Sequence, residues 1–108
     1  MEKVDIKIAR ACVAEYEATM KKLGITSPAE GLTNSVGFPG PELLKWMQGI
    51  SNYMTELRVV FGVYTKELSP ENAGRFTVFL WPYNEDGEPA KDEEGEEVPP
   101  VNVGDLLP

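Results

Sequence analysis

Histidine is absent from the chain, and cysteine occurs only once, at Cys12. A single cysteine excludes a disulfide within one chain, and without histidine the commonest zinc ligand sets cannot be assembled. A catalytic thiolate at Cys12 would also lack the histidine that usually acts as its base. We therefore expect no metal site, no cofactor and no catalytic residue, and we predict that Cys12 is a core side chain.

Long apolar runs are also missing. No stretch approaches the ~20 apolar residues that a membrane-spanning helix needs. Charged and apolar residues alternate over positions 1–7, unlike the uninterrupted apolar core of a secretion signal. We expect a cytoplasmic protein that does not bind membranes, and a length of 108 residues predicts one domain spanning 1–108.

The net charge of -8 is unevenly distributed. Eight acidic residues and one basic residue lie between Glu85 and Glu97, so the rest of the chain carries only -1. We predict that residues 84–98 form a flexible, solvated acidic segment. It does not match an EF-hand, because Asp86 and Asp92 lack the alternating acid spacing and the closing glutamate. The basic residues of the N-terminal region are diluted by acidic ones, so we expect no nucleic-acid binding.

Two helices are predicted from the spacing of apolar residues. Over 3–23 the apolar stripe Ile8, Cys12, Tyr16 and Met20 recurs every four residues, and Gly24 can end the helix. Over 41–55 a proline at the first position precedes a second apolar stripe, formed by Leu43, Met47, Ile50 and Met54. Residues 25–40 are predicted to be mostly loop, because they are rich in Gly, Pro, Ser, Thr and Asn.

The period then changes to two, which predicts strands over 57–65 and 75–82. A hairpin that brings the cleaner apolar rows to one face requires the numbers of paired residues to add up to an odd total. We predict a register with a total of 139; a shift of two residues would keep the same faces and change the partners. We call this the inner face and expect it to face the core; it comprises Leu57, Val59, Phe61, Val63, Phe76, Val78 and Leu80.

The predicted fold class is α+β, with the two helices packed on a small antiparallel sheet built around the hairpin. A two-stranded sheet is marginally stable alone, so a third strand is expected. It would come either from an edge strand at Val101-Asn102-Val103 or from a second chain.

The opposite face of the hairpin, here called the outer face, is unusually apolar for a surface left in water. Its candidate binding residues are Arg58, Val60, Tyr64, Phe79 and Trp81. The predicted register places Arg58 across from Trp81, which allows a cation–π contact. Either the C-terminal segment or a helix covers this face, or it binds a partner or a second copy.

From Leu43 onward the chain resembles a group of small bacterial, Bacteroidetes-like helix-plus-hairpin proteins of unknown function. The resemblance lies in a Leu-Leu helix, the strand sequences ELRVVFG and FTVFL, and a terminal Pro-Pro-x-Asn-x-Gly. Those proteins usually read Ile-Arg-x-Tyr-Phe-Gly and end in Pro-Pro-x-Cys, whereas this chain has Val60 for the tyrosine and no late cysteine. The resemblance implies the helix and hairpin, and no activity.

Three functional hypotheses follow. The first is a non-enzymatic protein-interaction module or self-associating protein that binds a protein partner or a second copy through the outer face. The second is a small-molecule-binding or catalytic protein with a pocket between helices and sheet, which would use Tyr53, Tyr64, Arg58 and Glu56. The third is an inhibitor that docks its acidic segment on a basic target.

Overall fold

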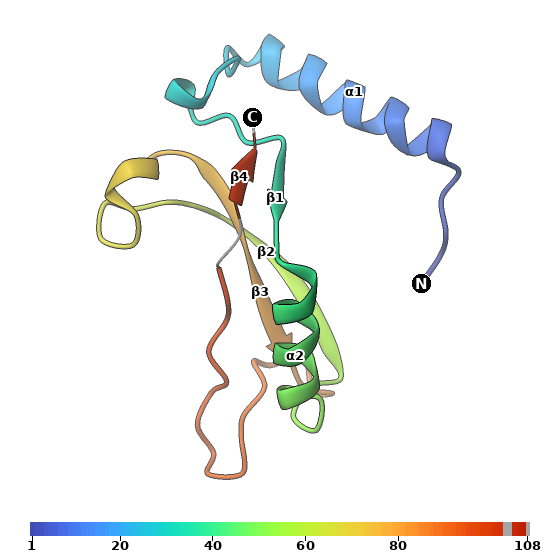
Figure 1. The fold of residues 1–108 in the computed structure, drawn as a ribbon, viewed down its shortest axis with the longest axis vertical. Helices are drawn as coiled ribbons and strands as arrows, with labels where there is room; N and C mark the ends of the chain where they lie inside the picture. The colour runs from blue at the N-terminus through green and yellow to red at the C-terminus, as the bar shows by residue number, and fades with distance from the viewer. Residues whose placement is uncertain (103–104, 108) are drawn as a thin grey trace.

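The computed structural model of the chain describes residues 1–102 and 105–107 and confirms the α+β class. Figure 1 shows the arrangement of its helices and strands. Their order is α1 (Ile6–Lys22), the 3₁₀ turn η1 (Pro28–Glu30), β1 (Ser35–Gly37), α2 (Gly40–Ile50), β2 (Glu56–Val63), the 3₁₀ turn η2 (Pro70–Asn72), β3 (Phe76–Tyr83) and β4 (Asp105–Leu107). Both predicted helices and both predicted strands are present, and α2 ends five residues earlier than predicted.

The hairpin of β2 and β3 is antiparallel and has the predicted register. Val59 lies opposite Leu80, and Phe61 lies opposite Val78. Because residues that are paired in this way point to the same face of a sheet, the predicted inner and outer faces are those of the structure.

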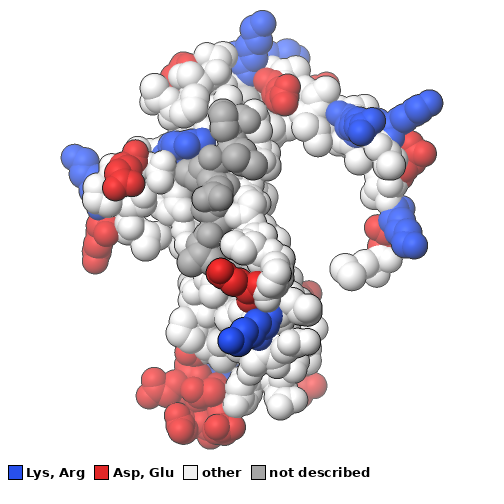
Figure 2. All heavy atoms as spheres, in the orientation of Figure 1, with Lys and Arg blue, Asp and Glu red and all other residues white. Residues whose placement is uncertain are grey.

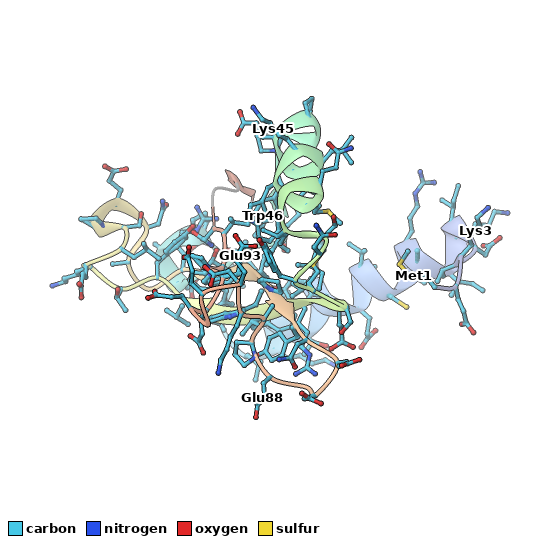
Figure 3. The ribbon with its side chains drawn as sticks, turned by 90° about the horizontal axis from the view of Figure 1, so that it is seen from below. Met1, Lys3, Lys45, Trp46, Glu88 and Glu93 are labelled. Carbon is cyan, nitrogen blue, oxygen red and sulfur yellow. The ribbon has the colours of Figure 1, made fainter. Side chains whose placement is uncertain are left out.

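The inner face is covered at one end only. Leu80 is buried, as is Pro82, which continues its row. Helix α2 lies over this end of β3, and Trp46 points from α2 toward the hairpin (Figures 1 and 3). At the other end, Phe61 is 84% exposed. The prediction that the whole inner face packs into a core is therefore wrong, because α2 has only 11 residues, about 16 Å of helix, and cannot span it.

Helix α1 begins at the N-cap Asp5, whose carboxylate accepts hydrogen bonds from the backbone N–H groups of Lys7 and Ile8. It ends at Lys22, followed by the C-cap Leu23 and by Gly24, which takes the left-handed conformation with a φ of 79°. The helix extends from the body as an arm (Figure 1) and contains no buried residue. The predicted packing of this helix on the sheet is therefore not observed, and Cys12, predicted to be a core side chain, is exposed.

Residues 84–98, which we predicted to be flexible, fold into two matching turns. In the first, Asn84 Oδ1 accepts hydrogen bonds from the N–H groups of Asp86 and Glu88. In the second, Asp92 Oδ1 does the same for Glu94 and Glu96. Asp86-Gly87 and Glu94-Gly95 are turn signals in the sequence, and both turns form at these glycines.

Between and after the two acidic turns, apolar residues anchor the segment to β3. The N–H of Ala90 donates to the carbonyl of Pro82, and the N–H of Val98 donates to the carbonyl of Ala90. The side chains of Ala90 and Val98 are buried. The acidic residues are therefore presented on a folded support at the end of the molecule remote from α1 (Figure 2).

The C-terminal segment does add to the hairpin, but only as a single bridge. Val101 exchanges two backbone hydrogen bonds with Leu80 at the edge of β3, whereas Val103 of the predicted edge strand lies outside the described residues. A second two-stranded sheet forms instead where β4 pairs antiparallel with β1. Strand β1 falls within the region predicted to be mostly loop, because three residues are too few for a period-two signal.

Candidate functional site: an apolar groove

An open groove of about 780 Å³ lies between the α1 arm and the uncovered end of the inner face. It is lined by Cys12, Val13, Tyr16 and Met20 of α1, by residues 33–36 and by residues 61–63 and 76–78 of the hairpin. None of these fourteen residues carries a charge. The groove therefore suits an apolar occupant.

The groove is shaped by hydrogen bonds at the base of the arm. The hydroxyl of Tyr16 donates to the carbonyl of Thr33 at 2.7 Å. The carbonyl of Gly31 accepts from the N–H of Phe76 at 3.0 Å, which ties the connector to the start of β3. Gly31 has a φ of 103°, and a β-carbon there would come within 2.8 Å of the Gly74 carbonyl oxygen, so this close approach requires glycine. These contacts set where α1 leaves the body.

Several apolar side chains of the groove walls are exposed. Among the wall residues, Val63 is 51% exposed, and Phe61, at 84%, is the most exposed aromatic side chain of the hairpin. On α1, Val13 is 55% exposed. Contiguous apolar surface of this kind marks contact sites in soluble proteins.

The five residues predicted to form a binding site on the outer face meet different environments. Tyr64 is buried, and its hydroxyl donates to Asn102 Oδ1 at 2.6 Å. The Asn102 amide in turn donates to the Thr77 hydroxyl and to the carbonyl of Val78. The C-terminal segment therefore covers this end of the outer face, which is one of the two alternatives that the sequence left open.

The other four predicted residues remain partly accessible. Val60, Phe79 and Trp81 are half-buried, and Phe79 lies over Gly62, where a β-carbon would come within 3.0 Å of its ring. The indole N–H of Trp81 is buried and has no hydrogen-bond partner among the described residues. The outer face is thus engaged largely by its own chain.

Arg58 is exposed, and its guanidinium stacks on Tyr83, 3.9 Å from the ring centroid. We predicted stacking on Trp81, which is the directly opposite residue. Arg58 instead pairs with Glu56, two positions before it on the same strand, and this places the guanidinium over the ring at the next same-face position of β3. The hydrogen bond to Glu56 raises the pKa of Arg58 above its usual value.

The four residues of the small-molecule hypothesis are not brought to one cavity. Tyr53, Tyr64, Arg58 and Glu56 line neither the groove nor the smaller cleft beside α2. The hydroxyl of Tyr53 donates instead to Glu93 of the second acidic turn at 2.9 Å, and this bond raises the pKa of Tyr53.

In the part of the chain that the structure describes, no three His, Cys, Asp or Glu side chains are placed to hold a metal ion. Over the same residues, none of the helices has the length and apolarity required to cross a bilayer.

Comparison with protein-family models, curated proteins and solved structures finds no match to this chain. The candidate site therefore stands on geometry alone. Sequence reasoning had identified both apolar rows that form the groove, the α1 stripe and the inner face of the hairpin. It missed the site because it assumed that the two rows cover each other.

Proposed function

We propose that this protein is a non-enzymatic protein-interaction module that docks an apolar helical face in the groove between α1 and the hairpin. The observation that carries the proposal is the exposure of Phe61 in a groove with uncharged walls. Helix-in-groove binding is a common mode of protein recognition, and its energy comes from apolar side chains on one face of the docked helix.

The chemistry of the groove favours binding over catalysis. Its walls supply the hydroxyls of Tyr16, Thr33, Ser35 and Thr77 and the thiol of Cys12, and they include no carboxylate or basic side chain. General acid–base catalysis most often uses an imidazole, a carboxylate or an amine, and no wall residue carries one of these groups. The outer face is a weaker candidate, because Tyr64 is already bonded to Asn102.

A model helix tests this function. The probe is a fluorescein-labelled 18-residue peptide with leucine on one face and equal numbers of Lys and Glu on the other, followed by fluorescence anisotropy. We expect Phe61→Ser to weaken its binding at least tenfold, because burying a Phe side chain contributes about 1.5–3 kcal/mol.

The matched control is Leu68→Ser, which also removes an exposed apolar side chain but lies outside the groove. The Leu68→Ser variant should bind the model helix with the same affinity as the unmodified protein. Equal loss in both variants, or no binding to the unmodified protein at concentrations at which it is a monomer, would contradict the proposed function.

A further inference from the structure

Resting on this proposed function, we propose that the occupant of the groove is helix α1 of a second copy of the same chain. Each copy inserts the N-terminal half of its α1 into the groove of the other, so that the two exchanges are related by a twofold axis. Such an interface is self-complementary, as twofold dimers require, because every chain carries both the helix and the groove.

The surface area of the single chain supports a large missing contact. The chain exposes 8091 Å², whereas a compact monomer of its 12.0 kDa mass exposes about 6,000 Å². Its radius of gyration is 16.1 Å, against about 13 Å for a compact domain of this length. If each of two copies buried the excess, the interface would reach about 4,000 Å², which lies in the range of obligate homodimers.

The unpartnered surface lies on α1 and in the groove next to it. The base of α1 is held to the body by the bond from Tyr16 to Thr33, whereas the half before Tyr16 has no hydrogen bond or ion pair to the body among the described residues. Ile6, Ile8 and Val13 in that half are each more than half exposed. A helix of 17 residues is about 25 Å long, so its free half can reach into a neighbouring copy while its base stays attached.

The charge distribution is compatible with this occupant. Residues 1–24 carry five basic and four acidic side chains, a net charge of +1, and the rest of the chain carries five basic and fourteen acidic ones, a net charge of -9. Basic and acidic side chains are interspersed on the α1 arm, and acidic ones gather at the far end of the body (Figure 2). The exchanged half, residues 1–15, carries three basic and three acidic side chains and is net neutral, which suits a groove without charged walls, and the acidic turns stay away from the interface.

Substitutions on two faces of α1 provide the first part of the test. Val13→Asp places a carboxylate on the groove face, and we expect it to raise the dimer dissociation constant about 100-fold or more, because burying an unpaired charge is costly. Ala11→Asp makes the same change in charge on the opposite side of α1 and should change that constant less than about threefold. Analytical ultracentrifugation measures both. Since α1 has no buried residue, both variants should keep their helical circular dichroism spectrum.

Crosslinking identifies which chain fills the groove. A photoreactive p-benzoylphenylalanine is placed at position 61 in an equimolar mixture of ¹⁴N- and ¹⁵N-labelled protein, and crosslinked peptides are identified by mass spectrometry. The proposal predicts mixed-isotope crosslinks to residues 6–16. Crosslinks only within one chain would show that α1 folds back on its own groove and would overturn the proposal.

The remaining outcomes separate this inference from the function on which it rests. Mixed-isotope crosslinks confined to segments other than α1, or no crosslinks at all, would overturn the helix exchange. The proposed function would still stand if the model helix binds through Phe61, and it would fall with the exchange if the model helix does not bind.

Discussion

Phe61 lies directly opposite Val78 in the hairpin, on the face that also carries the buried Leu80. A cross-strand apolar pair stabilises a sheet by roughly 0.2–1 kcal/mol. The larger contribution, from removing Phe61 from water, is not realised within one chain, because 84% of this residue stays exposed. In the helix exchange proposed above, α1 of a second copy supplies the contact that buries Phe61.

The free energy of unfolding that Phe61→Ser removes should depend on protein concentration. The loss should be small where the protein is a monomer and larger where it is a dimer. In a single chain the substitution removes an exposed side chain, so we expect a change within about 0.5 kcal/mol. In the dimer the same side chain is buried, and the loss should be about 2–3 kcal/mol. Thermal unfolding at low and high micromolar concentration measures the difference, and a destabilisation that does not vary with concentration would contradict this prediction.

Removing the Tyr64 hydroxyl should destabilise the hairpin end where the C-terminal segment docks. Tyr64→Phe leaves Asn102 Oδ1 without its 2.6 Å donor in a part-buried position, at an expected cost of about 1–2 kcal/mol in urea unfolding. Tyr53→Phe is the control, because the bond of that hydroxyl to Glu93 is exposed. Equal losses of unfolding free energy in the two variants would mean that the hydrogen bond to Asn102 contributes no more than the exposed bond to Glu93.

The acidic turns depend on glycine at their left-handed positions. Gly87 and Gly95 have φ values of 77° and 79°, so replacing either with alanine should destabilise the protein by about 1–2 kcal/mol. Gly49→Ala provides the opposite control, because Gly49 lies inside α2, where a β-carbon meets nothing within 4 Å. It should stabilise the protein by roughly 0.5–1 kcal/mol. Chemical unfolding measures all three, and a neutral result at Gly87 and Gly95 would contradict the ordered turns.

The connector between α1 and β1 should loosen in acid. The hydroxyls of Thr26 and Ser27 and the N–H of Thr26 donate to the carboxylate of Glu30, and these bonds lower the pKa of Glu30 below its usual 4.5. Since the pKa is lower in the folded state, the stabilisation is present above the unfolded pKa and is lost as the pH falls through the folded one. Carboxyl NMR titration should show that Thr26→Val raises the pKa of Glu30, and an unchanged pKa would refute the assignment.

The sequence predicted the local structure of this protein better than its packing. Alternation alone predicted which side chains share a face with Phe61, because a shift by one residue would turn every apolar side chain to the other face. A shift by two residues would keep these faces, so alternation did not determine that the partner of Phe61 is Val78. Four-residue spacing likewise gave the apolar stripe of α1. The covering of each face depends instead on where the connectors direct the helices, and the direction of α1 rests on contacts such as that of Tyr16 with Thr33, which no periodicity encodes.

The most direct test of the account is the molar mass of the full chain, measured by size-exclusion chromatography with multi-angle light scattering over a range of concentrations. We predict a species of twice the 12.0 kDa chain mass for the unmodified protein and for Leu68→Ser, and the single-chain mass for Phe61→Ser and Val13→Asp at the same micromolar concentrations. A single-chain mass for the unmodified protein at high micromolar concentration would contradict the exchange of α1 between copies.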